Sequence, residues 1–227
     1  MKIAEIFYSL QGEGANMGKP AIFIRFTGCN QNCWFCDTNW QNGVEMSVAE
    51  ILQEIEKFPA KMIIWTGGEP TLQLNNEILS HFTHYYNAIE TNGTNPVPSK
   101  IDYISCSPKV DVEILQKNFD FVNEFRFSYC NSTRHCGLAP QSLEKKDDSD
   151  ESMNGKGTQP IAAFTAMTLP KIDYLPKADN YFLSPILLGN DVFGKKNAEN
   201  INSCINFIKQ NPQWRLSFQT HKLLGFA

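Results

Sequence analysis

The sequence has little excess charge of either sign, no long apolar run and too few cysteines for a disulfide scaffold. Its formal net charge is −4 over 227 residues, so it lacks the basic surface that favours nucleic acid or an anionic membrane. No apolar run approaches the about 20 residues that a transmembrane helix requires. A glutamate interrupts the N-terminal apolar residues too early for a signal peptide. We therefore expect a cytoplasmic protein that binds neither nucleic acid nor membranes.

The cysteine content points away from disulfides and toward a metal or a catalytic site. Seven cysteines are few for a chain of this length, and an odd number cannot all pair with one another. In a reducing compartment, clustered cysteines indicate metal binding or catalysis. The chain is 42% hydrophobic and 19% charged, which is typical of one globular domain with a substantial core. We expect a single domain over residues 1–227.

Strand-like and helix-like patterns alternate along most of the chain. Strand patterns cover 21–26, 62–65, 87–94, 101–109, 121–129, 180–186 and 214–219, and helix patterns cover 47–58, 75–86 and 198–210. Ser47 and Glu50 have the spacing of a capping box at the start of the first helix. This alternation predicts βα units and a parallel sheet, which is an α/β fold.

Polar motifs directly follow several of the predicted strands. They are TGGEP at 66–70, ETNGT at 90–94 and SPK at 107–109. A loop that contains three cysteines follows the strand at 21–26 in the same way. Ligands bind at the carboxyl ends of parallel strands, so we expect these four segments to meet at one end of the sheet.

Residues 131–160 interrupt the alternation of strands and helices. They are polar, rich in Gly, Ser and Asp, and show no apolar period. We expect a solvated, flexible insertion there. Without it the chain is well short of the about 250 residues of a full eight-unit barrel. The length therefore favours a reduced, open βα barrel.

Cys29, Cys33 and Cys36 lie within eight residues of one loop. A structural zinc site requires a fourth ligand. Iron–sulfur clusters are held by thiolates, and three thiolates would leave one iron of a cubane open to a substrate or cofactor. The three-cysteine loop therefore favours an iron–sulfur cluster.

The other cysteines have simpler interpretations or lie far away in the sequence. Cys106 and Cys204 fall in strand and helix patterns and are expected to be small buried hydrophobes. Cys130, His135 or Cys136 could supply a fourth zinc ligand, but they follow the loop by about a hundred residues. A non-catalytic zinc or ferredoxin-like module thus remains an alternative.

The cysteine spacing resembles the signature of the radical S-adenosylmethionine (SAM) superfamily. The pattern is Cys-x3-Cys-x2-Cys, with the aromatic Phe35 directly before the last cysteine. In that superfamily the open iron of a [4Fe–4S] cluster binds SAM, and reduction cleaves SAM to a 5′-deoxyadenosyl radical. TGGEP resembles the superfamily's glycine-rich second motif, whose glycines let the backbone approach SAM closely.

Several segments together resemble the 7-carboxy-7-deazaguanine synthase family within this superfamily. They are SLQGEG at 9–14, CDT at 36–38, TGGEP, ETNGT, SPK and the terminal HKLLGFA at 221–227. The resemblance covers the chain except 131–160. It implies a carbon–nitrogen lyase with a partial TIM-like barrel of the radical SAM type. Such an enzyme contracts the ring of 6-carboxy-5,6,7,8-tetrahydropterin to 7-carboxy-7-deazaguanine, with loss of ammonia, in queuosine and 7-deazapurine biosynthesis.

The resemblance also implies a set of cofactor-binding residues. The [4Fe–4S] ligands would be Cys29, Cys33 and Cys36. The residues expected to bind SAM are Phe35, Cys36, Asp37, Gly68, Ser107, Pro108 and Lys109. Thr38 would give its hydroxyl oxygen to a Mg²⁺ that also contacts the substrate. SPI at 184–186 departs from the Gln-Pro pair that relatives often have there, so no SAM contact is assigned to Ser184.

The resemblance places the substrate among residues from both ends of the chain. The expected substrate-binding residues are Leu10, Gln11, Gly12, Glu13, Arg25, Thr66, His221 and Ala227, the last through its terminal carboxylate. Arg25 would pair with the substrate carboxylate. Glu90 and Thr38 are the expected catalytic residues, with Glu90 as a proton acceptor. A homodimer and an external one-electron donor such as flavodoxin are also implied.

Several of these residues have structural alternatives. Arg25 could pair with a structural carboxylate, and Glu90 could pair with Lys109. His221 could be a surface residue on a frayed tail. A glycyl-radical activase shares the cysteine spacing but acts on a protein. It would not require LQGEG, the Asp-Thr pair after the last cysteine, or a tail that faces the substrate.

Overall fold

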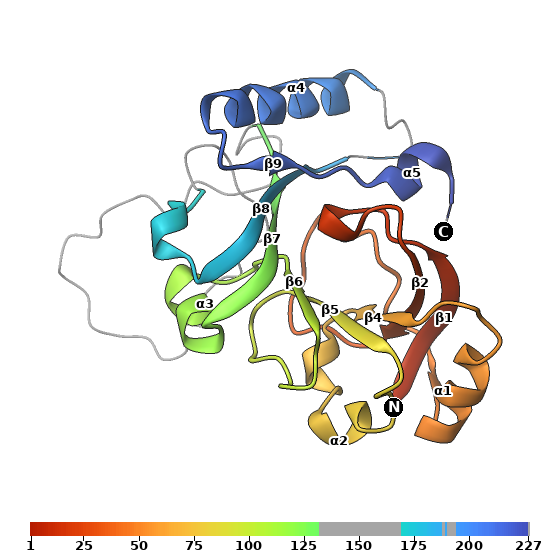
Figure 1. Ribbon diagram of the computed structural model, residues 1–227. Coiled ribbons are helices and arrows are strands. Elements are labelled where there is room, and N and C mark those ends of the chain that lie inside the picture. Colours follow the sequence, from red (N-terminus) through yellow and green to blue (C-terminus); the bar gives the residue numbers. More distant parts are fainter. Residues whose placement is uncertain (132–168, 188, 190–193, 227) are drawn as a thin grey trace, which may run out of the picture.

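One nine-stranded sheet runs through the computed structural model of the chain (Figure 1). The structure describes residues 1–131, 169–187, 189 and 194–226. All of the predicted insertion at 131–160 except Asn131 therefore lies outside the described residues. Within these ranges, no helix has the length and apolar character needed to cross a membrane.

The sheet is parallel except at one edge. Its strands are β1 (Lys2–Leu10), β2 (Pro20–Phe26), β3 (Val44–Glu45), β4 (Met62–Gly67), β5 (Tyr86–Thr91), β6 (Tyr103–Cys106), β7 (Phe121–Tyr129), β8 (Lys177–Pro185) and β9 (Arg215–Leu216). Their spatial order is β3-β1-β2-β4-β5-β6-β7-β8-β9. Neighbours from β2 onward are parallel, whereas β1 is antiparallel to both β2 and β3. The two edge strands, β3 and β9, do not pair with each other within the described chain, so the predicted open, partial barrel is confirmed.

Helices cover the outer side of the curved sheet (Figure 1). They are α1 (Val48–Ile55), α2 (Asn76–Leu79), α3 (Val112–Asn118) and α4 (Lys195–Gln210). The short helix α5 (Thr220–Leu224) and the 3-10 turns η1 (Gly14–Asn16), η2 (Pro70–Leu72) and η4 (Ile172–Tyr174) lie in connecting segments. On one side Ile51 of α1 packs in a cluster with Trp65 of β4. On the other, Cys204 of α4 packs with Phe125 and Phe127 of β7. Cys106 and Cys204 are both fully buried, as the sequence predicted.

The inner face of the sheet is polar. Strand register pairs Arg25 with Thr66, Glu90 with Ser105, and Ser105 with Glu124. Side chains in register point to the same face, so these residues form one row across β2 and β4 to β7. Thr66, Ser105 and Glu124 are each no more than 6% exposed. This row lies on the face opposite to the outer helices and forms the floor of the candidate site.

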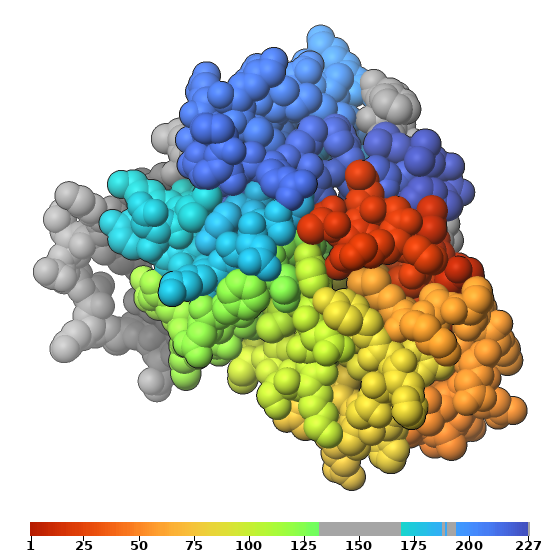
Figure 2. Space-filling model, viewed as in Figure 1, coloured from red at the N-terminus to blue at the C-terminus, as the bar shows by residue number. Residues whose placement is uncertain are grey.

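Segments from the two ends of the chain bridge the gap between the sheet edges. The backbone N–H of Gly14 donates to Ser217 Oγ (3.0 Å), and Thr220 donates to Gly12 O through its N–H (3.1 Å) and its hydroxyl (2.7 Å). A Cβ on Gly12 would lie 2.3 Å from His221 Nδ1. Figure 2 shows the C-terminal helix in dark blue against the red N-terminal segment. The barrel is closed here by loop contacts.

The sequence predicted most elements but was wrong about one helix and missed others. The helix predicted at 75–86 is only α2, because the chain turns into the core at Phe82 and β5 begins at Tyr86. The Asn87 side chain donates to the carbonyls of Phe82 (3.1 Å) and Tyr85 (3.0 Å). In a helix that reached residue 86, the Phe82 carbonyl would instead accept from the backbone N–H of Tyr86. Sequence reasoning did not assign β1, β3, α3 or α5. The strand predicted at 214–219 is only the two-residue β9.

Candidate active site

The cysteine loop begins where β2 ends and is tied to the loop that follows β4. Gly28 has φ +85° and donates its N–H to Trp40 O (3.2 Å), which closes the loop. Glu69 N donates to Gly28 O at 2.9 Å. A Cβ on Gly68 would lie 1.9 Å from Gly28 O and 2.9 Å from the Cys29 Cβ. Glycine at position 68 is therefore what allows the TGGEP and cysteine loops to approach this closely.

Buried Glu69 fixes the arrangement of the loops after β4 and β5. Its carboxylate accepts hydrogen bonds from the Thr91 hydroxyl (2.8 Å) and from the Asn92 backbone N–H (2.7 Å). It also accepts from the Thr71 hydroxyl at 2.6 Å. These bonds join TGGEP and ETNGT, so the convergence that the sequence predicted for these motifs is confirmed.

The three cysteines of the loop are free thiols that influence one another electrostatically. Burial raises the pKa of the Cys29 and Cys33 thiols, and the Lys109 ammonium opposes this effect at Cys33. No set of three His, Cys, Asp or Glu in the described chain is arranged around a single metal ion. A [4Fe–4S] cluster bonds each thiolate to a different iron, so it requires ligands that are farther apart than those of one zinc ion.

Cys130 departs from the expectation of free cysteines. It is buried at the end of β7 and is disulfide-bonded. Its partner is none of the other described cysteines, since all five of these are free. A disulfide sulfur offers no thiolate, so Cys130 does not supply the fourth zinc ligand that the sequence left open. His135 and Cys136 lie outside the described residues.

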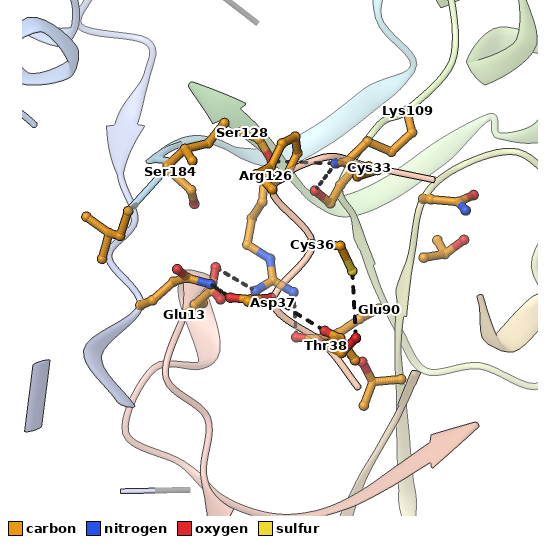
Figure 3. A pocket seen from close by; sticks show the side chains of 18 of the residues that line it. Glu13, Cys33, Cys36, Asp37, Thr38, Glu90, Lys109, Arg126, Ser128 and Ser184 are labelled. Carbon is orange, nitrogen blue, oxygen red and sulfur yellow. Dashed lines mark hydrogen bonds and ion pairs between the residues drawn. The ribbon is translucent and has the colours of Figure 1, made fainter. Parts of the chain in front are cut away.

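A first cavity of about 240 Å³ opens beside the cysteine loop (Figure 3). Six of the seven residues predicted to bind SAM line it, namely Phe35, Cys36, Asp37, Gly68, Ser107 and Lys109. Pro108 does not line it, and its carbonyl instead faces Lys109 Nζ at 3.4 Å. Lys109 Nζ also donates to Ser107 Oγ (2.8 Å) and lies 5.8 Å from the Phe35 ring centroid. Lys109 therefore does not pair with Glu90, the structural alternative raised by the sequence.

The same cavity holds an unpaired polar atom. Ser184 lines the cavity (Figure 3), and its buried Oγ has no hydrogen-bond partner among the described residues. Buried hydroxyls are normally hydrogen-bonded, so the orphaned Oγ is suited to a polar ligand. The sequence assigned no SAM contact to Ser184, because SPI departs from the pattern of relatives.

A second cavity of about 510 Å³ lies under the N-terminal segment. Seven of the eight residues predicted to bind substrate line it, namely Leu10, Gln11, Gly12, Glu13, Arg25, Thr66 and His221. Ala227 lies outside the described residues. Arg25 faces this cavity while its Nε donates to Glu5 Oε1 (2.6 Å). The structural carboxylate considered as an alternative partner is thus present, and the pairing of Arg25 with substrate stays a prediction.

The two cavities share a wall. Residues that line both are Glu13, Asp37, Thr38, Thr66, Glu90, Gln219 and Lys222. The residues predicted to bind the cofactor and those predicted to bind the substrate therefore lie in adjoining cavities. Both predicted catalytic residues, Glu90 and Thr38, stand at the junction.

Glu90 is held in the shared wall by three donors. Its Oε1 accepts from Gln11 Nε2 (3.1 Å) and Arg126 Nη2 (2.6 Å), and its Oε2 accepts from the Thr66 hydroxyl (3.0 Å). Burial opposes ionisation, but the Arg126 guanidinium and these hydrogen bonds outweigh it and lower the pKa of Glu90. Sequence reasoning missed Arg126. Its only signal was a charged residue between two phenylalanines in a buried strand.

The C-terminal segment is anchored to the cysteine loop. Lys222 Nζ donates to Asp37 Oδ2, and Gln219 Nε2 donates to the same oxygen at 3.3 Å. His221 belongs to α5 and lines the second cavity, so the interpretation of a frayed tail is wrong. Burial lowers the pKa of His221, which favours its neutral form.

Comparisons with known proteins agree with this geometry. Residues 23–122 match the family model described as the radical SAM superfamily. A protein of Bacteroides thetaiotaomicron named 7-carboxy-7-deazaguanine synthase is 36% identical over 225 residues, which cover 98% of this chain and 97% of the relative. The chain belongs to the 7-carboxy-7-deazaguanine synthase family. A second member, from Haemophilus influenzae, is 36% identical over 98% of this chain and 92% of its own length.

A solved structure supports the fold of the family. The crystal structure of QueE from Escherichia coli aligns with 96% of this chain and 92% of its own, with a TM-score of 0.58 and 23% identity. Membership in the family implies a [4Fe–4S] cluster and SAM. The three free thiols of the cysteine loop, of which Cys33 and Cys36 line the first cavity, and the Ser184 hydroxyl fit these groups.

We predict that Gly68→Ala disables the cofactor side of the site. The new Cβ would overlap Gly28 O, which is backbone and cannot rotate away, so the cysteine loop must shift. We expect a folded protein with much reduced SAM binding, measured by calorimetry on anaerobically reconstituted protein.

Gly18→Ala is the matched control for this substitution. Gly18 has φ +84°, so alanine is strained there by about 1–2 kcal/mol, but its Cβ would meet no atom within 4 Å. It should lower stability yet leave SAM binding intact. Wild-type SAM binding by Gly68→Ala would show that the close approach of the two loops is dispensable.

Proposed function

We propose that this chain is a radical SAM enzyme that converts 6-carboxy-5,6,7,8-tetrahydropterin to 7-carboxy-7-deazaguanine with loss of ammonia. The observation that carries the proposal is the pair of adjoining cavities. Residues expected at the cofactor line one cavity, residues expected at the pterin line the other, and Thr38, Thr66 and Glu90 stand between them. Relatives named for this activity cover nearly the whole chain.

On the cofactor side, Cys29, Cys33 and Cys36 would hold the cluster. When bound, the cluster and SAM supply one-electron, hydrogen-abstracting chemistry. Burial lowers the pKa of Lys109, but negative charge on Cys33 and Cys36 opposes this effect, so thiolates in the cysteine loop favour the ammonium that donates to Ser107. This charge suits a site that must hold thiolates and the SAM carboxylate.

On the substrate side, Gln11 and Glu13 would contact the guanidine-like edge of the pterin, which presents hydrogen-bond donors. Arg25 would bind the substrate carboxylate with its planar fork, while Glu5 holds it in orientation. Thr38 would ligate a Mg²⁺ that bridges to the substrate, since Mg²⁺ prefers oxygen ligands and often uses few protein groups. The neutral form of His221 would close the cavity against Gly12.

Glu90 would present an ionised carboxylate to the reacting part of the pterin. Its lowered pKa makes it a weak base, so a proton taken from a substrate N–H would be held only transiently. The three donors around Glu90 also fix its direction. Glu90 therefore both orients the substrate and exchanges protons with it.

The contacts of the tail favour a small substrate over a protein. A glycyl-radical activase must admit a polypeptide segment to its radical. Here α5 and the N-terminal segment are hydrogen-bonded to each other across the second cavity. This closure supports the pterin over the activase alternative.

The assay that tests the proposal follows product directly. Protein purified and reconstituted without oxygen is reduced with dithionite or reduced flavodoxin and supplied with SAM, Mg²⁺ and the carboxy-tetrahydropterin. We expect 7-carboxy-7-deazaguanine and ammonia in equal amounts, detected by mass spectrometry and an ammonia assay. Cys36→Ala should abolish product and lower bound iron, whereas Cys204→Ala should retain both. SAM cleavage without the deazapurine would refute the substrate but retain the superfamily.

We predict that Thr38→Val weakens the response of turnover to Mg²⁺ by about tenfold or more. Valine keeps the shape of threonine but has no oxygen to offer the metal. Thr38→Ser keeps the hydroxyl and should restore much of the response, while bound iron stays unchanged in both variants. An unaltered Mg²⁺ titration in Thr38→Val would remove Thr38 from the metal site.

We also propose that the chain assembles as a homodimer. On its outer side β1 pairs with β3 only at Lys2 and Ile3, so residues 5–10 have no strand neighbour there in the described chain. Tyr8 on this strand is 40% exposed. An open strand edge with apolar side chains is typical of an association surface. Sedimentation should give about twice the chain mass of 25.7 kDa, and a monomeric mass would contradict the proposal.

A further inference from the structure

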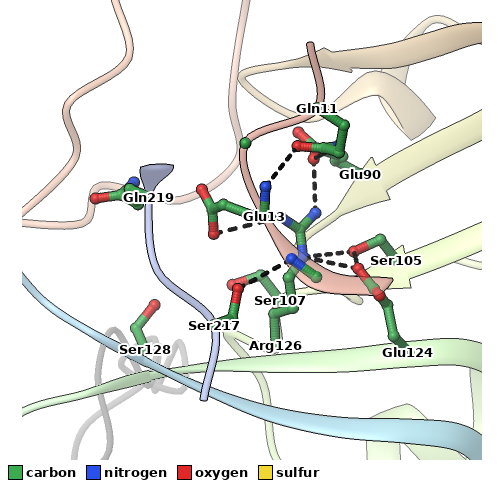
Figure 4. A network of polar contacts seen from close by, with 12 residues as sticks. Gln11, Glu13, Glu90, Ser105, Ser107, Glu124, Arg126, Ser128, Ser217 and Gln219 are labelled. Atoms are coloured by element: carbon green, nitrogen blue, oxygen red, sulfur yellow. Dashed lines mark hydrogen bonds and ion pairs between the residues drawn. The ribbon is translucent and has the colours of Figure 1, made fainter. Parts of the chain in front are cut away.

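Arg126 on β7 contacts three carboxylates, each through a different nitrogen (Figure 4). Nη2 lies 2.6 Å from Glu90 Oε1, Nη1 lies 3.3 Å from Glu13 Oε2, and Nε lies 3.1 Å from Glu124 Oε1. Nε also donates to Ser105 Oγ at 2.7 Å. The side chain is 7% exposed, so this cation is almost completely enclosed.

The three carboxylates differ in what else they contact. Glu124 is structural, since its Oε2 accepts from the Ala15 N–H (2.8 Å) and the Tyr103 hydroxyl (2.9 Å) and it lines neither cavity. Glu13 and Glu90 line both cavities. The guanidinium therefore connects a fixed anchor in the sheet to two carboxylates of the shared wall.

The negative charges of the three carboxylates require the Arg126 guanidinium between them. One cation serves three carboxylates in a buried position, so Glu13 and Glu90 would repel each other without it. Burial, with the nearby charges of Glu90 and Asp37, raises the pKa of Glu13, whereas Arg126 lowers that of Glu90. Glu13 and Glu90, which both contact the Arg126 guanidinium, thus differ in proton affinity.

We propose that Arg126 is a positioning residue that fixes Glu13 and Glu90 across the wall between the two cavities and thereby orients the pterin for reaction. The inference rests on the proposed function. Arg126 also lines the first cavity, but each of its three nitrogens contacts a carboxylate, so it acts through the two glutamates, and lysine could not replace it. The planar fork reaches three carboxylates in three directions, whereas a lysine ammonium is a single point charge.

The test compares Arg126→Lys with wild type in reconstituted protein. We expect the KM for carboxy-tetrahydropterin to rise about 10- to 100-fold, the range expected when charge-assisted hydrogen bonds are lost. The fraction of SAM cleavage that yields 7-carboxy-7-deazaguanine should fall, because a misplaced pterin intercepts the radical less often. Bound iron and SAM affinity should not change. A general structural defect would lower both.

Two further variants make the test specific. Arg215→Met removes an exposed arginine that stacks on Phe182 outside both cavities, and it should leave KM and coupling unchanged. Glu90→Gln combined with Arg126→Lys should raise KM by less than the product of the two single effects, because Arg126 acts partly through Glu90. Arg126→Lys keeps a cation among the carboxylates, so we expect it to fold, whereas Arg126→Met would leave three buried carboxylates without a cation.

The outcomes separate this inference from the proposed function. If the wild type makes no 7-carboxy-7-deazaguanine, the proposed function fails and the inference fails with it. If the wild type makes product and Arg126→Lys has wild-type KM and coupling, the inference alone is wrong. A loss of SAM affinity larger than the change in pterin KM would also overturn it, since Arg126 would then be a cofactor ligand.

Discussion

The interior of this protein depends on one buried guanidinium that compensates three carboxylates. Burying a carboxylate without a partner is costly, so Glu13, Glu90 and Glu124 could not share this space without Arg126. A closed eight-stranded barrel fills its interior with apolar side chains. Here the inner face carries a polar row, and two cavities for ligands adjoin it. Electrostatic compensation thus takes the place of apolar packing at the centre of the fold.

Around this centre, the loops that follow the parallel strands place the candidate functional residues at one end of the sheet. The cysteine loop follows β2, TGGEP follows β4, ETNGT spans the end of β5, and SPK follows β6. Glu69 and the close approach at Gly68 hold these loops together. The cofactor side is therefore preorganised by backbone contacts, while the substrate side is completed by segments from both ends of the chain.

Sequence patterns predicted the strands and helices whose formation depends on residues close together in the chain. β2, β4, β5, β6, β7, β8, α1 and α4 follow from hydrophobic period and capping, and the cysteine loop follows from spacing. The pattern at 75–86 misled because Asn87, from the next strand, satisfies the carbonyls that would have continued the helix. Arg126 could not be predicted, since its role depends on Glu90, which lies 36 residues away in sequence, and on Glu13 near the start of the chain. The anchoring of His221 likewise depends on Gly12, at the far end of the chain.

The contact between Gly12 and Thr220 has a consequence for how the protein is made. It joins residues 208 positions apart, and the second cavity is lined from both sides of this junction. The helices and parallel strands before it depend on neighbours closer in sequence and can form earlier during synthesis. The cofactor loops would thus be in place before the wall of the substrate cavity is complete. A nascent chain that has not reached α5 would hold an open, polar interior exposed to water.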